Sequence, residues 1–74
     1  MKIDRDSPVP YYEQLAAILR DLIQAGKLAG RLPSWQDLAA EYDIADSTVR
    51  HAISILREEG LVVTRGGKGT FVAR

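Results

Sequence analysis

The 74-residue sequence predicts an α+β domain that is mostly α, in which three helices are followed by a β-hairpin. Two observations indicate this order. Apolar residues recur at helical spacing in three separate stretches before Gly60, and β-branched residues flank a glycine-rich stretch after it. A chain of this length has room for one small core, so we expect a single domain over residues 1–74.

The composition excludes several classes of function. The sequence has no cysteine, which excludes disulfides, cysteine-ligated metals and a cysteine nucleophile. No apolar run approaches the roughly 20 residues of a membrane span, and the N-terminus lacks a signal-peptide core, so we expect a cytoplasmic protein with no membrane partner. The net charge of zero counts against a nucleic-acid partner. The charge is polarised, however, because residues 1–46 hold five basic and eight acidic residues, whereas residues 47–74 hold five basic and two acidic.

Residues 1–9 are polar and end in a proline-containing break, which predicts an arm. The first helix is expected over 10–25, with Pro10 at its first position, where a missing N–H costs nothing. Gly26 is a good C-terminal stop for it. The apolar positions that keep helical spacing in this segment are Tyr12, Leu15, Ala16, Leu19, Leu22 and Ile23. We therefore expect this helix to pack on the core.

The second helix is expected over 34–42. Ser34 and Asp37 have the spacing of a capping box, with Asp in place of the usual Glu. Leu32, just before this helix, could add one rung to a small sheet. About four residues, with Ile44 as a plausible buried plug, then lead to the third helix, and this is the spacing of a helix-turn-helix unit.

The third helix, expected over 46–59 and ended by Gly60, has two different faces. Its apolar stripe consists of Val49, Ala52, Ile53 and Leu56. Its opposite stripe consists of Ser47, Arg50, His51, Ser54 and Glu58. Hydroxyls and an arginine near a helix N-terminus can reach base edges and phosphates in a major groove, so we interpret this segment as a base-reading helix. The alternative is an ordinary amphipathic helix with a solvated outer face.

The β-hairpin is expected over 61–73, with its turn in the glycine-rich stretch 66–69. Its tip offers backbone amides and Lys68, flanked by Arg65. Such a tip can lie along phosphates or enter a minor groove. The alternative is an ordinary glycine turn with solvated basic residues.

The order of these elements and their motifs resembles the winged helix-turn-helix DNA-binding domain of the GntR family of bacterial transcription regulators. The motifs are Pro10-Tyr11-Tyr12-Glu13-Gln14-Leu15, Leu32-Pro33-Ser34, Asp37-Leu38-Ala39, Ser47-Thr48-Val49-Arg50, Glu59-Gly60-Leu61 and Lys68-Gly69-Thr70-Phe71-Val72. The resemblance implies a regulator, with repression the expected mode, that binds a palindromic double-stranded operator as a homodimer. It also implies that the third helix reads the major groove and that the hairpin, the wing, touches the adjacent backbone or minor groove.

The candidate DNA contacts are Ser34, Gln36, Asp46, Ser47, Thr48, Arg50, His51, Arg65, Gly67, Lys68 and Thr70. Two of the family's usual features are missing among them. The family's Glu-Arg after Pro-Ser is replaced by Trp35-Gln36, and its Ser-Arg before the third helix is replaced by Ala45-Asp46. We therefore expect either weaker DNA binding than in family members that keep both arginines, or an altered operator.

Two interpretations are open for each of three side chains, which are Asp46, Trp35 and His51. Asp46 either caps the third helix or accepts a hydrogen bond from a cytosine amino group. Trp35 either covers the core edge or touches DNA backbone or a partner through its indole N–H. His51 is expected to be solvated or next to a phosphate. A metal-binding role is not expected, because no second metal ligand lies near it in the sequence.

Enzyme chemistry finds no support in the sequence. Ser47 and His51 lie one turn apart on an exposed helix without an oxyanion site, and the stretch 67–70 lacks the adjacent Lys and Ser/Thr of a phosphate loop. We expect no catalytic residue, cofactor or metal. The rival function is a winged helix that binds protein, which net neutrality and Asp46 favour. A small-molecule effector is expected only if a C-terminal domain exists outside this chain, and a nucleoid-associated location follows from the DNA-binding interpretation.

Overall fold

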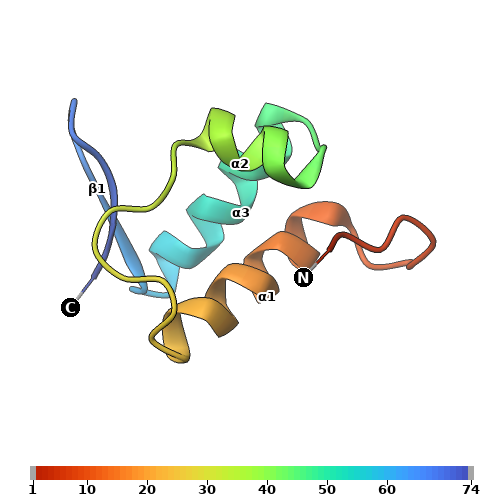
Figure 1. Ribbon diagram of the computed structural model, residues 1–74, viewed down its shortest axis with the longest axis horizontal. Helices are drawn as coiled ribbons and strands as arrows, with labels where there is room; N and C mark the ends of the chain where they lie inside the picture. Colours follow the sequence, from red (N-terminus) through yellow and green to blue (C-terminus); the bar gives the residue numbers. More distant parts are fainter. Residues whose placement is uncertain (1, 74) are drawn as a thin grey trace.

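The computed structural model describes residues 2–73 and shows three helices and a two-stranded antiparallel sheet in that range (Figure 1). The elements are α1 (Tyr11–Gln24), α2 (Trp35–Tyr42), α3 (Asp46–Glu58), β1 (Val62–Arg65) and β2 (Gly69–Val72). The mostly helical α+β fold expected from the sequence is therefore confirmed. Within the described residues, no helix combines the length and the apolar character needed to cross a membrane.

The third helix lies at the centre of the molecule, where it packs against α1, α2 and β1. Its inward residues Val49, Ala52 and Leu56 are fully buried, as the apolar stripe predicts. They meet Leu15 and Leu19, which are also fully buried, from α1. The core therefore fixes α3 along one face and leaves its other face for contacts outside the molecule.

The ends of α2 are defined by specific backbone groups. The hydroxyl of Ser34 accepts a hydrogen bond of 3.1 Å from the backbone N–H of Asp37, which confirms the expected cap. Asp43 ends the helix in the left-handed region at φ 55°. At α1 the expectation is off by one residue, since Pro10 is the N-cap with an extended backbone and the first helical residue is Tyr11.

The N-terminal arm is tied to the helices by two polar side chains. The Gln14 side chain accepts from the backbone N–H of Asp4 at 2.7 Å and donates to the backbone carbonyl of Val9 at 2.8 Å. The guanidinium of Arg5 donates to the carbonyls of Tyr42 and Asp43, at 3.0 and 2.6 Å, and so satisfies carbonyl groups at the C-terminal end of α2.

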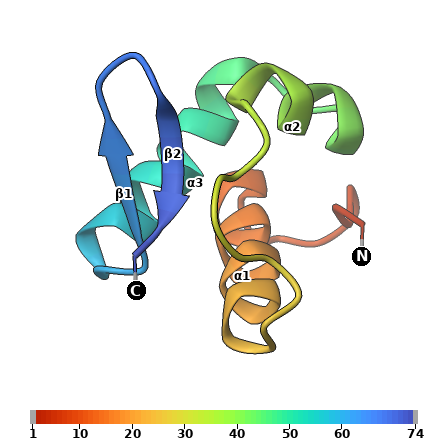
Figure 2. The ribbon, with the colours of Figure 1, turned by 60° about the vertical axis from the view of Figure 1, so that its left-hand side comes forward.

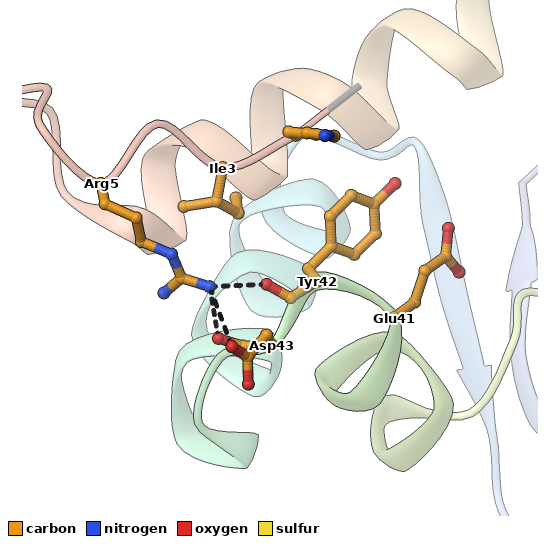
Figure 3. Close-up of a pocket in the computed structure, with 6 residues that line it drawn as sticks. Ile3, Arg5, Glu41, Tyr42 and Asp43 are labelled. Atoms are coloured by element: carbon orange, nitrogen blue, oxygen red, sulfur yellow. Dashed lines mark hydrogen bonds and ion pairs between the residues drawn. The ribbon is translucent and has the colours of Figure 1, made fainter.

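These contacts border a hollow of about 270 Å³ between the arm and the end of α2 (Figure 3). Its lining residues are Lys2, Ile3, Arg5, Glu41, Tyr42 and Asp43. Burial raises the pKa of the Tyr42 phenol above its usual value, and the Glu41 carboxylate adds to this. Ile3, which lines the hollow, is only 9% exposed, so this part of the arm packs on the core.

An ion pair joins α1 to the residue that follows α3. Arg20 donates two hydrogen bonds, of 2.9 and 2.8 Å, to the two carboxylate oxygens of Glu59. This bidentate contact lowers the pKa of Glu59 below its usual 4.5 and raises the pKa of Arg20. The pair therefore fixes the C-terminal end of α3 relative to α1.

The wing pairs in a single register, with Val62 opposite Val72 and Arg65 opposite Gly69. Strand β2 is also bonded along its other edge to the segment that precedes α2. There the N–H of Leu32 donates to the carbonyl of Thr70, and the N–H of Val72 donates to the carbonyl of Gly30, both at 2.8 Å. The extra rung expected at Leu32 exists, but the bridging residue is Arg31, opposite Phe71.

Candidate nucleic-acid interface

The outer face of α3 is solvent-exposed. Ser47, Arg50 and His51 are exposed, and Thr48 is half-buried. The wing lies beside this helix, and its turn and α2 lie toward the same side of the molecule (Figure 2). The residues expected to read bases and the residues expected to touch the backbone are therefore on connected elements.

A hollow of about 220 Å³ joins α2, α3 and the wing. Its lining residues are Trp35, Arg50, Ile53, Arg57, Thr64 and Thr70. The central carbon of the Arg50 guanidinium lies 4.0 Å from the centroid of a ring of Trp35, which is cation–π geometry. Two of the expected contact residues, Arg50 and Thr70, thus share one recess, and the first residue of α2 forms part of its wall.

Trp35 is half-buried and packs against the edge of the core. This confirms the first of its two interpretations. The structure adds a role that the sequence did not suggest, because the ring that covers the core edge also holds the guanidinium of Arg50. Gln36 and Ser34 are exposed at the same end of α2, and the Ser34 hydroxyl is already used as the helix cap.

The wing tip is exposed from Arg65 to Lys68. The N–H of Lys68 donates to the carbonyl of Arg65 at 2.9 Å and closes the turn, and Gly67 occupies a positive φ of 72° that disfavours other residues. The guanidinium of Arg65 lies over the ring of Phe71, with 5.7 Å between its central carbon and the ring centroid. The tip therefore presents two basic side chains and a glycine backbone to solvent.

His51 lies on the side of α3 that faces α1. Its ring stacks on the ring of Tyr12, with centroids 3.8 Å apart and planes inclined by 14°. The next polar side chain on this stripe, Ser54, donates its hydroxyl to the carbonyl of His51 at 2.9 Å, a bond within the helix. The outer stripe is thus divided, with Arg50 turned toward Trp35 and His51 turned toward Tyr12.

The helix-cap interpretation of Asp46 is wrong. The N-cap of α3 is Ala45, which has an extended backbone and provides no side-chain cap. Asp46 is the first helical residue, one position too late for its carboxylate to act as the N-cap. Its negative charge still interacts favourably with the N-terminal end of the helix dipole, and the side chain is exposed.

Two arginines near the wing were missed as candidates from the sequence. Arg57 donates to the hydroxyl of Thr64 at 2.7 Å and so ties α3 to β1. Arg31 lies across the wing, where its Nε is 2.9 Å from the position that a side-chain Cβ on Gly69 would occupy. The expected rung at Leu32 was the one signal that could have placed Arg31 next to the wing.

The basic side chains on these elements outnumber the acidic ones. The basic residues on α3, the wing and the segment paired with it are Arg31, Arg50, Arg57, Arg65 and Lys68, and the acidic residues on the same elements are Asp46 and Glu58. Among residues 2–73, no group of three or more His, Asp or Glu side chains is placed to hold a metal ion. The side chains of this surface therefore carry an excess of positive charge.

Comparison with known sequences identifies relatives among transcription regulators. The chain is 40% identical over 76 aligned residues to the HTH-type transcriptional repressor NagR of Bacillus subtilis, covering all of this chain and 31% of NagR. It is 35% identical to the histidine utilization repressor of Klebsiella aerogenes, covering 93% of this chain and 30% of that protein. The chain thus spans about a third of the length of these curated relatives.

Solved structures give the same result for the fold. YtrA of Sulfolobus acidocaldarius, a GntR-family transcription factor, superposes with a TM-score of 0.86 at 35% identity, covering 99% of this chain and 78% of YtrA. The DNA-binding domain of AraR, solved in complex with operator ORX1, superposes with a TM-score of 0.86 at 27% identity, covering 99% of both chains. The winged-helix fold is therefore confirmed.

The profile of the family described as "Bacterial regulatory proteins, gntR family" matches residues 11–72, from the start of α1 to the end of the wing. This is a family of transcription regulators and not of enzymes, in agreement with the expectation from the sequence. The chain belongs to the gntR family of bacterial regulatory proteins.

Proposed function

We propose that this chain binds double-stranded DNA in a sequence-specific manner, as the DNA-binding part of a bacterial transcriptional repressor. In this proposal α3 enters the major groove and the wing lies on the backbone or in the adjacent minor groove. The observation that carries the proposal is the recess that Arg50 of α3 and Thr70 of the wing both line. It makes the reading helix and the wing one surface, as a duplex requires.

The expected contacts divide by chemistry into base readers and phosphate ligands. Arg50 can donate two parallel hydrogen bonds to a guanine, and the exposed hydroxyl of Ser47 can reach a base or a phosphate. We propose that the exposed Asp46, which does not cap α3, accepts a hydrogen bond from a cytosine amino group. The proposed backbone contacts are Ser34, Gln36, Thr48, His51, Arg65, Gly67, Lys68 and Thr70.

We further propose that two copies bind a palindromic operator. A single head contacts one half-site, and two linked heads gain affinity because the second binds at high effective concentration. NagR and the histidine utilization repressor are about three times as long as this chain, which leaves room in them for a dimerising and effector-binding part. A small-molecule effector would act through such a part and not through the surface described here.

Selection from a random duplex pool, followed by fluorescence anisotropy with the selected sequence, tests the proposal. We expect enrichment of a palindrome, and we expect Arg50→Ala to weaken binding by about 1–3 kcal/mol and to relax the preference at one base pair per half-site. Arg50→Lys keeps the charge but loses the paired donors, so it should lose most of that preference as well.

Lys27→Ala is the matched control, because Lys27 is an exposed basic residue in the loop after α1 and outside the proposed surface. It should leave the affinity unchanged. If the wild-type chain bound no duplex at low salt up to high micromolar protein, the protein-binding interpretation of the fold would replace this proposal. An unchanged operator affinity in Arg50→Ala would show that α3 is not the reading helix.

A further inference from the structure

The contact between Trp35 and Arg50 joins the first residue of α2 to the outer face of α3. The position of the indole is fixed by two independent features. Ser34, the preceding residue, caps the helix, and the ring itself packs against the core edge and is half-buried. The flexible side chain of Arg50 therefore rests on a rigid aromatic plane, with its guanidinium carbon 4.0 Å from the ring centroid.

A guanidinium stacked on an aromatic face keeps its hydrogen-bonding capacity. The N–H groups of arginine lie in the plane of the guanidinium, so the ring occupies a face while the edges remain available for a base or a phosphate. The stack restricts the torsions of the long side chain before DNA arrives. Binding then loses less side-chain entropy, and the direction of the two parallel donors is set in advance.

The two arginines that line the recess, Arg50 and Arg57, make different contacts. The guanidinium of Arg57 donates to Thr64 at 2.7 Å and holds the wing to α3. The guanidinium of Arg50 rests on the ring of Trp35 in the same recess. Arg50 is thus the arginine of this recess that can turn its donor edge toward a base.

We propose that Trp35 is a positioning residue for Arg50, and that this head recognises one guanine per half-site through the stacked pair instead of through Arg50 alone. The inference rests on the proposed DNA-binding function. In it Trp35 touches no base, and it sets specificity by holding the guanidinium in the orientation that pairs with guanine O6 and N7. The tryptophan therefore acts on sequence preference more than on general affinity for DNA.

The first arm of the test needs no DNA. Trp35 is the single tryptophan of the chain, so its fluorescence reports this contact directly. We expect Arg50→Ala to raise the acrylamide quenching constant of Trp35, because one face of the ring becomes accessible, and we expect Arg50→Lys to raise it less. Equal quenching in the wild type and in Arg50→Ala would show that the stack does not persist in solution and would overturn the proposal.

The second arm uses the selected operator and its single-base variants. We expect Trp35→Leu to weaken binding to the selected operator by about 3- to 10-fold and to lose preference at the base pair that Arg50→Ala identifies. Trp35→Phe, which keeps an aromatic face, should lie between the wild type and Trp35→Leu. The double variant should bind as Arg50→Ala does, since Trp35 has no role once the guanidinium is absent.

Tyr42→Leu is the matched control, because it removes a half-buried aromatic side chain from the other end of α2. It should keep the base preference. If the losses of Trp35→Leu and Arg50→Ala multiplied in the double variant, or if Trp35→Leu weakened all sequences equally, the positioning role would be refuted while DNA binding stood. If the selection enriched no sequence, the proposed function itself would fall, and this role with it, whatever the quenching showed.

Discussion

Removal of one wing cation should change the salt dependence of DNA binding by a calculable amount. Of the basic side chains on the proposed surface, Arg57 is engaged with Thr64 and Arg50 is assigned to a base. Arg65 and Lys68 remain as the charged groups among the proposed backbone contacts, and we count Arg31, which is exposed and lies beside Gly69 of the wing, as a third phosphate ligand. Each neutralised phosphate contributes about −0.9 to the slope of log K against log salt, so a single head should show a slope of about −2.7.

Lys68→Ala should reduce the size of this slope to about −1.8. Between 50 and 200 mM salt the wild type would then lose affinity by about 40-fold and the variant by about 12-fold. The loss should be the same for the selected operator and for a random duplex, because a phosphate contact carries no sequence information. Anisotropy titrations at four or five salt concentrations, with both duplexes, measure the two slopes.

Lys27→Ala again provides the control, since it changes the net charge equally at a site away from the proposed surface. Its slope should match that of the wild type. Equal slopes for Lys68→Ala and the wild type would show that the wing tip does not neutralise a phosphate. A reduction of the same size in Lys27→Ala would show that the slope reports net charge and not contacts, and the phosphate count above would be refuted.

Two further predictions concern the supports of the site. Ser34→Ala removes the bond to the N–H of Asp37, so it should cost about 1 kcal/mol of stability and lower the melting temperature by about 4–8 °C. Ser47→Ala, which removes no cap, should leave the melting temperature unchanged. An unchanged melting temperature for Ser34→Ala would contradict the capping role. Glu59→Gln weakens the pair with Arg20. Because folding lowers the pKa of Glu59, the pair contributes to the free energy of unfolding above pH 4.5, and this contribution is lost as the pH falls through the pKa of Glu59 in the folded state. Thermal melts from pH 7 to pH 3 should show the wild type more stable than Glu59→Gln at pH 7 and the difference shrinking in acid; a difference independent of pH would contradict this linkage.

The order and type of the elements could be predicted from the sequence because their signals are local. The spacing of Val49, Ala52 and Leu56 specifies which face of α3 is buried, and the structure buries all three. The cap at Ser34 is local as well, because its hydroxyl accepts from the backbone N–H three residues later. The turn of the wing follows from its glycines. Each of these features depends on residues that are neighbours in the chain.

The features that could not be predicted depend on contacts between distant residues or on a register of one residue. Nothing near Trp35 in the chain indicates that its ring meets Arg50, fifteen positions later, since that contact requires the crossing of α2 and α3. The sequence predicts the extra rung at Leu32 and not at Arg31, because the register depends on Phe71, which lies near the other end of the sequence. One of the two interpretations of Asp46 has it cap α3, but the cap position is Ala45, so Asp46 lies one residue too late for that role although the helix begins at the expected residue.

The double pairing of β2 confines mobility to a short part of the wing. Because β2 is bonded to β1 along one edge and to the Gly30–Leu32 segment along the other, the strand is anchored over its length and cannot swing as a simple hairpin. The three residues between the strands, 66–68, are where adjustment to a groove remains, so the ordering entropy lost on binding should be small. The same anchorage means that a change of length in the loop between α1 and α2 would shift the wing directly, and altered loop lengths should therefore change the reach of the tip across a duplex.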